Sequence, residues 1–249
     1  IGGSDGVIMS FEVDSPPDEV IYGDPFYVML ILENKGEHTI PPEEYSIRLK
    51  GFSPDAFDTT NDELLIQGSD VGEKLQAREL NPDNGEIIDS YPVYVNIPLS
   101  GDPLMYEGGI AGNKDFPFVA EMCYTYKTIA NGELCIKEKL TDSTDTQVCT
   151  VSGPKTISSS AAPVKISELK EYTGGTDAIR FSFNVIAAST GGSISERNTG
   201  CSNDNRFENN IYVMVDLGDS FNAGLECNGL VGGDNPRSGY VKINSGSRQ

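Results

Sequence analysis

The sequence has a single histidine and no tryptophan, and none of its five cysteines forms a Cys-x-x-Cys pair. Zinc fingers and most imidazole metal sites need several histidines or paired cysteines, so these sites are excluded. A Ser-His-Asp or Cys-His device would depend on His38, which has no nucleophile motif beside it. No run approaches the ~20 apolar residues that span a bilayer. We therefore expect no enzyme activity, no resident cofactor or metal, and no transmembrane segment.

Aspartate and glutamate outnumber lysine and arginine by 38 to 18, which gives a formal net charge of -20. Such a chain repels phosphate, so nucleic acid is not an expected partner. The acidic residues favour either a solvated surface suited to high salt or divalent-cation binding. The candidate calcium ligands are Asp55, Asp58, Asp62, Asp142 and Asp145. Neither group has the glycine and final glutamate of a calcium loop, so calcium is the weaker of these two interpretations.

Alternating or β-branched runs, bounded by Gly, Pro, Asn and Asp, predict strands along the whole chain. The first strand alternates Val7, Met9, Phe11 and Val13 with polar or outward positions. We expect strands at residues 6–13, 25–34, 45–51, 87–97, 116–128, 133–139, 147–151, 164–172, 178–187, 210–217, 225–228 and 239–243. Only residues 70–80 could form a short helix. The predicted fold class is all-β.

A change in composition predicts a domain boundary near residues 152–162. Ser152-Gly153-Pro154 and the small residues 158–163 are typical of a connector. We therefore expect an N-terminal β-sandwich domain at residues 1–152 and a C-terminal immunoglobulin-like domain at residues 153–249. Together they would form two immunoglobulin-like antiparallel β-sandwich domains in tandem.

The cysteines are expected to form a disulfide framework in an exported protein. Asn131-Gly132 predicts a hairpin turn that brings Cys123 close to Cys135. Cys201 and Cys227 flank a predicted strand and form the second expected pair. Cys149 is then left as a free thiol, an interchain partner, or the partner of a cysteine beyond residue 249.

The sequence begins with isoleucine, which we interpret as the loss of an upstream signal or anchor segment. This would place the protein at the cell surface or in the extracellular space. No Asn-x-Ser/Thr triplet occurs, so any glycan would be O-linked. The candidate acceptors are residues 158–160 and 59–60.

Several stretches resemble a group of archaeal cell-surface proteins with immunoglobulin-like modules. The likeness rests on residues 6–11 with 15–17, the corner at 32–36, residues 123–128 with 134–136, residues 148–151, and residues 162–164. The second half is similar to adhesion-related modules abbreviated CARDB. The resemblance implies a tandem β-sandwich architecture at the cell surface and no catalytic residue. Members of the group carry a further cysteine after the last strand, which implies a partner for Cys149.

Two functions from different classes fit these features. The first is a structural protein, a subunit of a surface layer, sheath or filament that associates with itself or with neighbouring surface proteins. Val7, Met9, Phe11 and Val13 would then be donated to a neighbouring subunit by β-strand addition, although an ordinary first strand is the preferred interpretation. The second is a monomeric adhesion or ligand-binding module that uses the loops at 53–72 and 101–114. A hydrolase is a third and weaker interpretation.

Overall fold

The computed structural model describes residues 3–109, 111–137, 149–175, 178–188, 192–202, 204–218 and 224–243. The chain divides into two compact units, Gly3–Lys127 and Thr128–Gln249. Residues 128–152, which the composition assigned to the N-terminal domain, belong to the second unit. Each unit is described by itself below.

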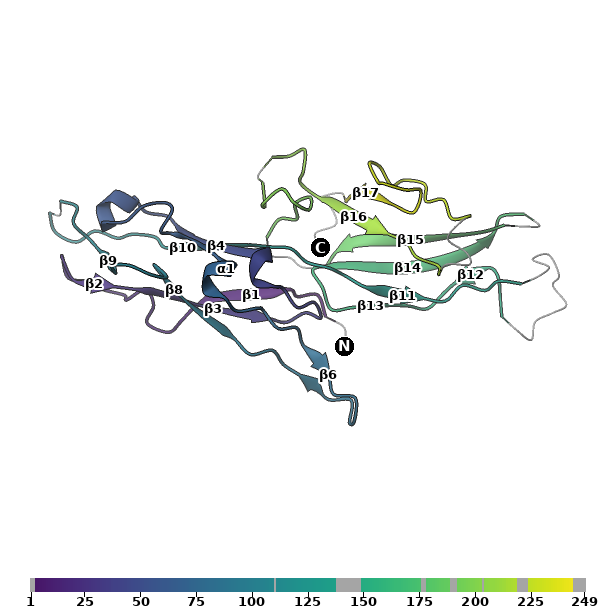
Figure 1. Cartoon of the computed structure of the whole chain (residues 1–249), viewed down its shortest axis with the longest axis horizontal. Coiled ribbons are helices and arrows are strands. Elements are labelled where there is room, and N and C mark those ends of the chain that lie inside the picture. The colour runs from purple at the N-terminus through teal and green to yellow at the C-terminus, as the bar shows by residue number, and fades with distance from the viewer. Residues whose placement is uncertain are drawn as a thin grey trace. The chain divides into compact units, whose positions relative to one another are not determined.

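The first unit consists almost entirely of short antiparallel strands (Figure 1). Its strands are β1 (Val7–Phe11), β2 (Pro25–Phe26), β3 (Val28–Asn34), β4 (Tyr45–Lys50), β5 (Leu65–Gln67), β6 (Glu79–Leu80), β7 (Ile87–Ile88), β8 (Val93–Ile97), β9 (Leu104–Met105) and β10 (Val119–Tyr124). Two three-stranded sheets have the orders β1-β3-β8 and β10-β4-β5, and β2-β9 and β6-β7 form two-stranded ribbons. The short helical elements are η1 (Pro42–Glu44), η2 (Pro54–Phe57) and α1 (Gly68–Val71).

The two three-stranded sheets share one apolar core. Alternate residues of β3 are buried, and Val28, Leu30 and Leu32 have no exposed surface. They belong to the same cluster as buried residues of β8, β4 and β5, so the sheets pack face to face as a sandwich. Burying each large aliphatic side chain contributes roughly 1.5–3 kcal/mol, and this face-to-face packing therefore defines the register of the strands.

The corner after β3 depends on the buried side chain of Asn34. Its Nδ2 donates hydrogen bonds to the carbonyls of His38 at 2.7 Å and Leu75 at 3.1 Å. Its Oδ1 accepts a hydrogen bond from the Gly36 N–H at 3.0 Å. The turn at residues 34–36 is therefore made by an asparagine side chain that replaces backbone partners.

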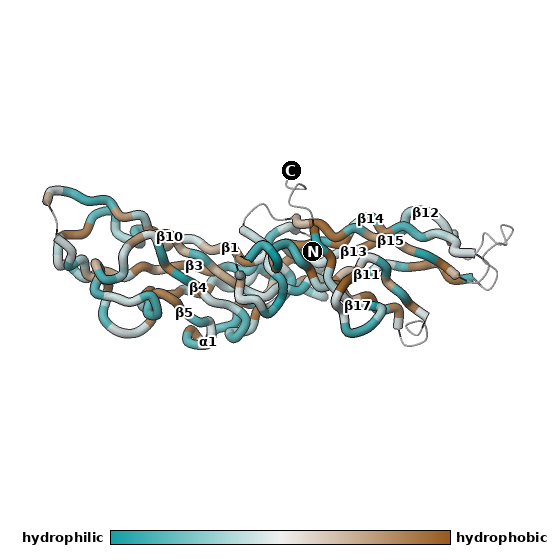
Figure 2. Tube along the Cα trace, turned by 90° about the horizontal axis from the view of Figure 1, so that it is seen from above, coloured by the Kyte–Doolittle hydropathy of each residue, from teal (hydrophilic) through white to brown (hydrophobic). Residues whose placement is uncertain are grey.

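In the described part of the second unit, the antiparallel strands form three hydrogen-bonded groups. They are β11 (Ala130–Gly132) with β13 (Ile157–Ser159), β12 (Gly153–Pro154) with β14 (Val164–Thr173) and β15 (Ile179–Ala187), and β16 (Asn210–Met214) with β17 (Ser238–Lys242). The register of β14 against β15 shifts between Ser167 and Lys170, where Glu168 has a left-handed φ of 54°. A residue in that conformation accommodates the extra residue of a β-bulge. Hydrophobic and hydrophilic residues both occur along β14 and β15, where the colour changes between brown and teal (Figure 2).

The predicted connector at residues 152–162 is not a connector. It carries β12 and β13, and Ala161 and Ala162 have no exposed surface. Small residues occur here because the segment is packed into the second unit. No strand is present at 133–137, 149–151 or 225–228, where the sequence predicted strands; residues 138–148 are outside the described part.

The all-β prediction is confirmed for the described residues, with α1 as their one α-helix. That helix covers residues 68–71, at the start of the range expected to carry one. Within the same residues no helix is long and apolar enough to cross a membrane.

Candidate functional site

The strongest candidate site is the side of the first sandwich where β1 and β10 form neighbouring open edges. In the described part of the first unit, each of these strands has a hydrogen-bonded partner on one side only, β3 for β1 and β4 for β10. An edge strand presents unpaired N–H and C=O groups that can pair with another strand. We refer to this side as the open side.

The ladder pattern identifies which backbone groups face the open side. The N–H of Thr125 donates to the carbonyl of Glu44, which assigns the odd-numbered residues of β10 to the ladder with β4. Antiparallel pairing alternates, so Ala120, Met122 and Tyr124 direct their N–H and C=O groups away from β4. The edge of β10 therefore offers backbone partners at every second residue.

The same residues of β10 carry a row of incompletely buried apolar side chains. Ala120 is opposite Leu49, and Met122 is opposite Ile47, both of which are buried core residues. Yet the side chains along both edges are only partly buried. On and before β10 these are Phe116, Phe118, Ala120, Met122 and Tyr124, and on β1 they are Val7, Met9 and Phe11. The core of the sandwich is thus incompletely covered along its open side.

One end of the open side is closed by a hydrogen bond between the two edges. The backbone N–H of Val7 donates to the hydroxyl of Tyr124 at 3.3 Å. Burial raises the pKa of Tyr124, so this hydroxyl stays neutral at physiological pH.

The other end of the open side widens into an aromatic pocket of about 570 Å³. Ring centroids of Phe57 and Phe116 are 4.9 Å apart, and those of Tyr106 and Phe116 are 5.0 Å apart. Lys114 Nζ lies 4.9 Å from the centroid of Phe116. The lining includes four carboxylates, Glu12, Asp14, Asp18 and Asp115. An aromatic floor with an acidic rim can hold an apolar or a cationic group.

The loops expected to form a binding surface do meet at this pocket. The loop at 53–72 contributes Phe57, and the loop at 101–114 contributes Tyr106, with ring centroids 5.3 Å apart. The N–H of Glu107 also donates to the carbonyl of Ala56 at 2.9 Å. The two ranges are far apart in the sequence, so their meeting is a property of the tertiary structure.

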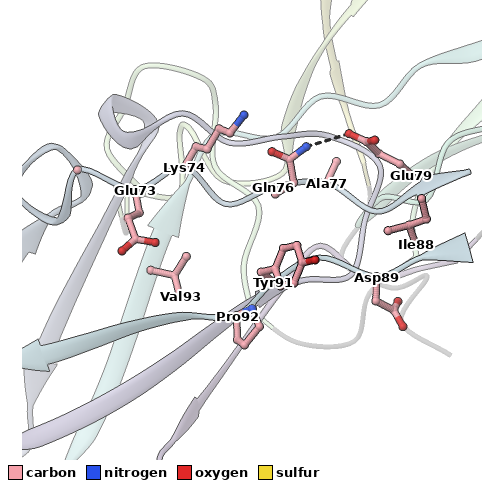
Figure 3. A pocket seen from close by; sticks show the side chains of 11 residues that line it. Glu73, Lys74, Gln76, Ala77, Glu79, Ile88, Asp89, Tyr91, Pro92 and Val93 are labelled. Atoms are coloured by element: carbon pink, nitrogen blue, oxygen red, sulfur yellow. Dashed lines mark hydrogen bonds between the residues drawn. The ribbon is translucent and has the colours of Figure 1, made fainter. Parts of the chain in front are cut away.

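A second cavity of about 560 Å³ lies beside the ribbon of β6 and β7, which projects from the rest of the first unit (Figures 1 and 3). Gln76 Nε2 donates to Glu79 Oε1 at 2.9 Å within it. Tyr91, also on its wall, is 83% exposed. The lining is open and of mixed polarity, and it brings together no convergent set of reactive groups.

The predicted disulfide between Cys123 and Cys135 is wrong. Cys123 lies on β10 opposite Ser46 of β4, whereas Asn131-Gly132 lies within β11 and pairs with β13. These pairings place the Asn-Gly sequence in a strand and remove the expected hairpin.

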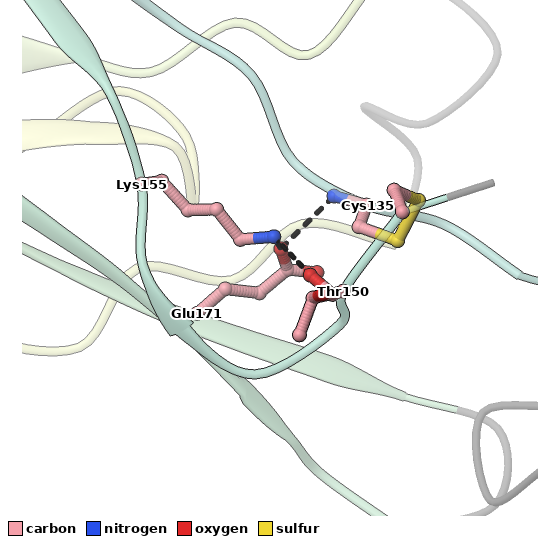
Figure 4. Close-up of a disulfide and its surroundings, with 5 residues drawn as sticks. Cys135, Thr150, Lys155 and Glu171 are labelled. Carbon is pink, nitrogen blue, oxygen red and sulfur yellow. Dashed lines mark hydrogen bonds and ion pairs between the residues drawn. A yellow bond between two sulfur atoms is a disulfide. The ribbon is translucent and has the colours of Figure 1, made fainter. Parts of the chain in front are cut away.

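The observed disulfide joins Cys135 to Cys149, with Cα atoms 5.8 Å apart (Figure 4). Cys149 was expected to lack an intrachain partner, and this expectation is wrong. The pair of Cys201 and Cys227 is also wrong, because Cys227 is a free thiol. Cys201 and Cys123 are each in a disulfide.

A buried ion pair that the sequence did not reveal lies beside the disulfide (Figure 4). Glu171 has no exposed surface, and its Oε2 is 2.9 Å from Lys155 Nζ. The same oxygen accepts a hydrogen bond from the Cys135 N–H at 2.9 Å. Its other oxygen, Oε1, has no hydrogen-bond partner among the described residues. The arrangement ties β14 to the segment that holds the disulfide.

The strand at the N-terminus is paired within its own unit. Val7, Met9 and Phe11 lie in β1 with β3 as partner, whereas Val13 follows the strand and is 79% exposed. After β1, the Ser15 hydroxyl accepts a hydrogen bond from the Met29 N–H at 2.6 Å. The N-terminal segment is therefore an ordinary first strand that pairs with β3 of the same unit.

The remaining candidates are placed as follows. Among the described residues no group of three or more His, Cys, Asp or Glu could hold a metal, although Asp55, Asp58 and Asp62 are described; Asp142 and Asp145 lie outside them. Of the candidate glycan acceptors, Thr59 is buried, and residues 157–159 form β13, in which Ser158 is exposed. Burial lowers the pKa of His38, whose ring contacts Tyr126.

No family model matches the chain, and no curated protein or solved structure matches it at a significant level. The open side and its pocket are therefore interpreted from their own geometry.

Proposed function

We propose that the chain is a non-enzymatic, extracellular structural protein, a subunit of a cell-surface layer, sheath or filament. Its first sandwich would join a neighbouring protein by accepting an extended segment beside β10. The observation that carries this proposal is the open edge of β10, where unpaired backbone groups and partly buried apolar side chains occur on the same residues.

The strand connectivity supports the proposal. Under this proposal, the orders β1-β3-β8 and β10-β4-β5 would correspond to strands A, B and E and strands F, C and C′ of an immunoglobulin-like sandwich. In such a sandwich a last strand, G, lies beside F and covers the core. In the described part of the first unit nothing pairs in that position, so an incoming strand would complete the sheet.

The role differs from the one that the N-terminal alternation suggested. β1 is paired with β3, and residues 12–15 are hydrogen-bonded in place, so the donor role for Val7, Met9 and Phe11 is not the one we propose. These side chains instead form one wall of the open side. The first unit would therefore accept a strand.

The location is supported by disulfide bonding and by charge. Cys135, Cys149, Cys123 and Cys201 are disulfide-bonded, and disulfides persist mainly in oxidising compartments. A net charge of -20 keeps copies apart at low salt, so assembly would be favoured where salt screens repulsion. The resemblance to archaeal cell-surface proteins with CARDB-like modules agrees with this location.

Light scattering and negative-stain microscopy of the intact chain, from low to molar salt, test the proposal. Ala120→Pro removes an N–H that faces the open side and leaves the ladder with β4 in place, since edge strands tolerate proline there. Tyr94→Pro is the matched control, because Tyr94 faces the open edge of β8 by the same alternation. We expect salt-promoted oligomers that Ala120→Pro abolishes and Tyr94→Pro retains. A chain that stays monomeric at all salt concentrations, alone and with its neighbouring surface proteins, would contradict the proposal.

A monomeric adhesion or ligand-binding module is the second candidate. The meeting of the loops at 53–72 and 101–114 around the aromatic pocket favours it. It predicts a monomer whose ligand binding depends on Phe57 and Tyr106 and is unchanged by Ala120→Pro.

A further inference from the structure

We propose that the segment accepted by the open side carries a lysine or arginine whose cationic group enters the aromatic pocket. This rests on the proposed function and names the chemistry of the partner: an extended segment of another polypeptide with alternating apolar side chains and a basic residue at one end. The apolar residues of the segment would lie along β10. Its basic residue would lie next to Phe116 and Phe118, which precede the first residue of β10.

The aromatic pocket continues the apolar row of the open side. Phe116 and Phe118 precede β10 and extend its core-facing row, and Phe11 ends β1 on the opposite wall. Val7 and Tyr124 close the far end by their hydrogen bond. A strand placed along this side would therefore direct its side chains over the apolar row and reach the pocket at one end only.

The pocket already holds a cationic group of this chain. Lys114 Nζ is 4.9 Å from the ring centroid of Phe116 and 5.9 Å from that of Tyr106. Both distances are within the ~6 Å at which a ring face attracts an ammonium group. Lys114 is exposed and lies outside the strands, so a second cation can replace it over these rings at little cost in stability.

The charge on the rim favours a basic occupant over an acidic or a neutral one. Glu12, Asp14, Asp18 and Asp115 line the pocket, with Lys114 as its single basic residue. An entering cation would gain the attraction of these carboxylates together with that of the rings. A carboxylate in the same position would face a rim of like charge.

Binding of fluorescein-labelled peptides of about ten residues to the intact chain tests the inference. The peptides alternate valine and threonine and carry lysine at one end or at the other, because the strand direction is not specified. Matched peptides replace that lysine by norleucine, which keeps the aliphatic stem without the charge, or by glutamate. We expect the lysine peptide to bind about tenfold more tightly than the norleucine peptide at low salt and to lose this advantage in molar salt.

Three protein variants localise the effect. Asp115→Asn should reduce the preference for lysine over norleucine, and Lys114→Ala should strengthen binding of the lysine peptide by removing its internal competitor. Ala120→Pro should weaken all three peptides together. Peptides with N-methylated backbone amides supply the same test on an unchanged protein, free of any effect of proline on the edge strand.

The outcomes separate this inference from the proposed function. Equal binding of the lysine and norleucine peptides, with both lost in Ala120→Pro, overturns the inference and leaves strand acceptance intact. Lysine-specific binding that survives both Ala120→Pro and N-methylation overturns strand acceptance, and the inference with it. The absence of binding by every peptide overturns both.

Discussion

The backbone N–H of Val7 on β1 donates a hydrogen bond to the hydroxyl of Tyr124 on β10, at 3.3 Å, and joins the edges of the two sheets of the first unit. It closes one end of the open side, so it should contribute to stability as well as to shape. We expect Tyr124→Phe to destabilise the first unit by about 0.5–1.5 kcal/mol, the usual net value of one hydrogen bond. Chemical denaturation measures this, with Tyr94→Phe as the exposed control; equal effects of both changes would show that the hydrogen bond contributes nothing.

Asn34→Ala should destabilise the first unit more than a typical substitution in a turn. The change removes the hydrogen bonds of the Asn34 side chain with the Gly36 N–H and with the carbonyls of His38 and Leu75, although the Leu75 carbonyl keeps its hydrogen bond from the Ile40 N–H. We expect a loss of about 2–4 kcal/mol in the free energy of unfolding. Asn96→Ala, on an exposed position of β8, should change it by less than about 0.5 kcal/mol. A small effect of Asn34→Ala would mean that the corner is held by the strands alone.

Glu171→Gln should destabilise the second unit because it leaves Lys155 buried without its carboxylate partner. Breaking such a pair on one side costs about 3–5 kcal/mol. Replacing both residues, Glu171→Leu with Lys155→Met, should restore most of that loss, since a hydrophobic pair avoids desolvating two charges. Thermal denaturation of the single and double variants measures the difference; a double variant as unstable as Glu171→Gln would contradict the account.

Peptide mapping of the unreduced protein should recover Cys135 linked to Cys149. Replacing both by serine should cost about 3 kcal/mol, as expected for a short closed loop, whereas Cys227→Ser should leave stability nearly unchanged. Burial raises the pKa of Cys227, so its alkylation should be slow at pH 8 and accelerate above pH 9. Recovery of a Cys201–Cys227 peptide would contradict the assignment.

His38 should make the first unit less stable at mildly acidic pH. Burial lowers its pKa below 6.5, so the folded protein binds a proton here less readily than the unfolded chain does. Above pH 6.5 the titration of His38 therefore does not change the free energy of unfolding. As the pH falls from 6.5 through the lowered pKa of the folded state, the free energy of unfolding decreases. Comparing His38→Gln with the parent chain between pH 8 and pH 5 isolates this effect; parallel pH profiles would exclude it.

The sequence by itself determined the class of structure and much of the first unit. The alternation of Val7, Met9 and Phe11, and the apolar run of β3, predicted strands because a half-buried sheet repeats every two residues. Gly, Pro, Asn and Asp between the runs marked where strands end. These patterns depend only on neighbouring residues. They predict the observed strands correctly wherever tertiary packing favours the same conformation.

Strand partners, disulfides and the boundary between the units were decided by the tertiary structure. Asn131-Gly132 has the sequence of a hairpin turn but lies in β11, because pairing with β13 stabilises it as a strand. That pairing removes the hairpin between Cys123 and Cys135, and Cys135, whose N–H donates to the buried Glu171, is joined to Cys149 instead. The open edge of β10 likewise follows from which strands pair, since an edge is a property of the sheet. Side chains along one strand fix its faces, but contacts between residues far apart in sequence choose its neighbours, and no local pattern encodes them.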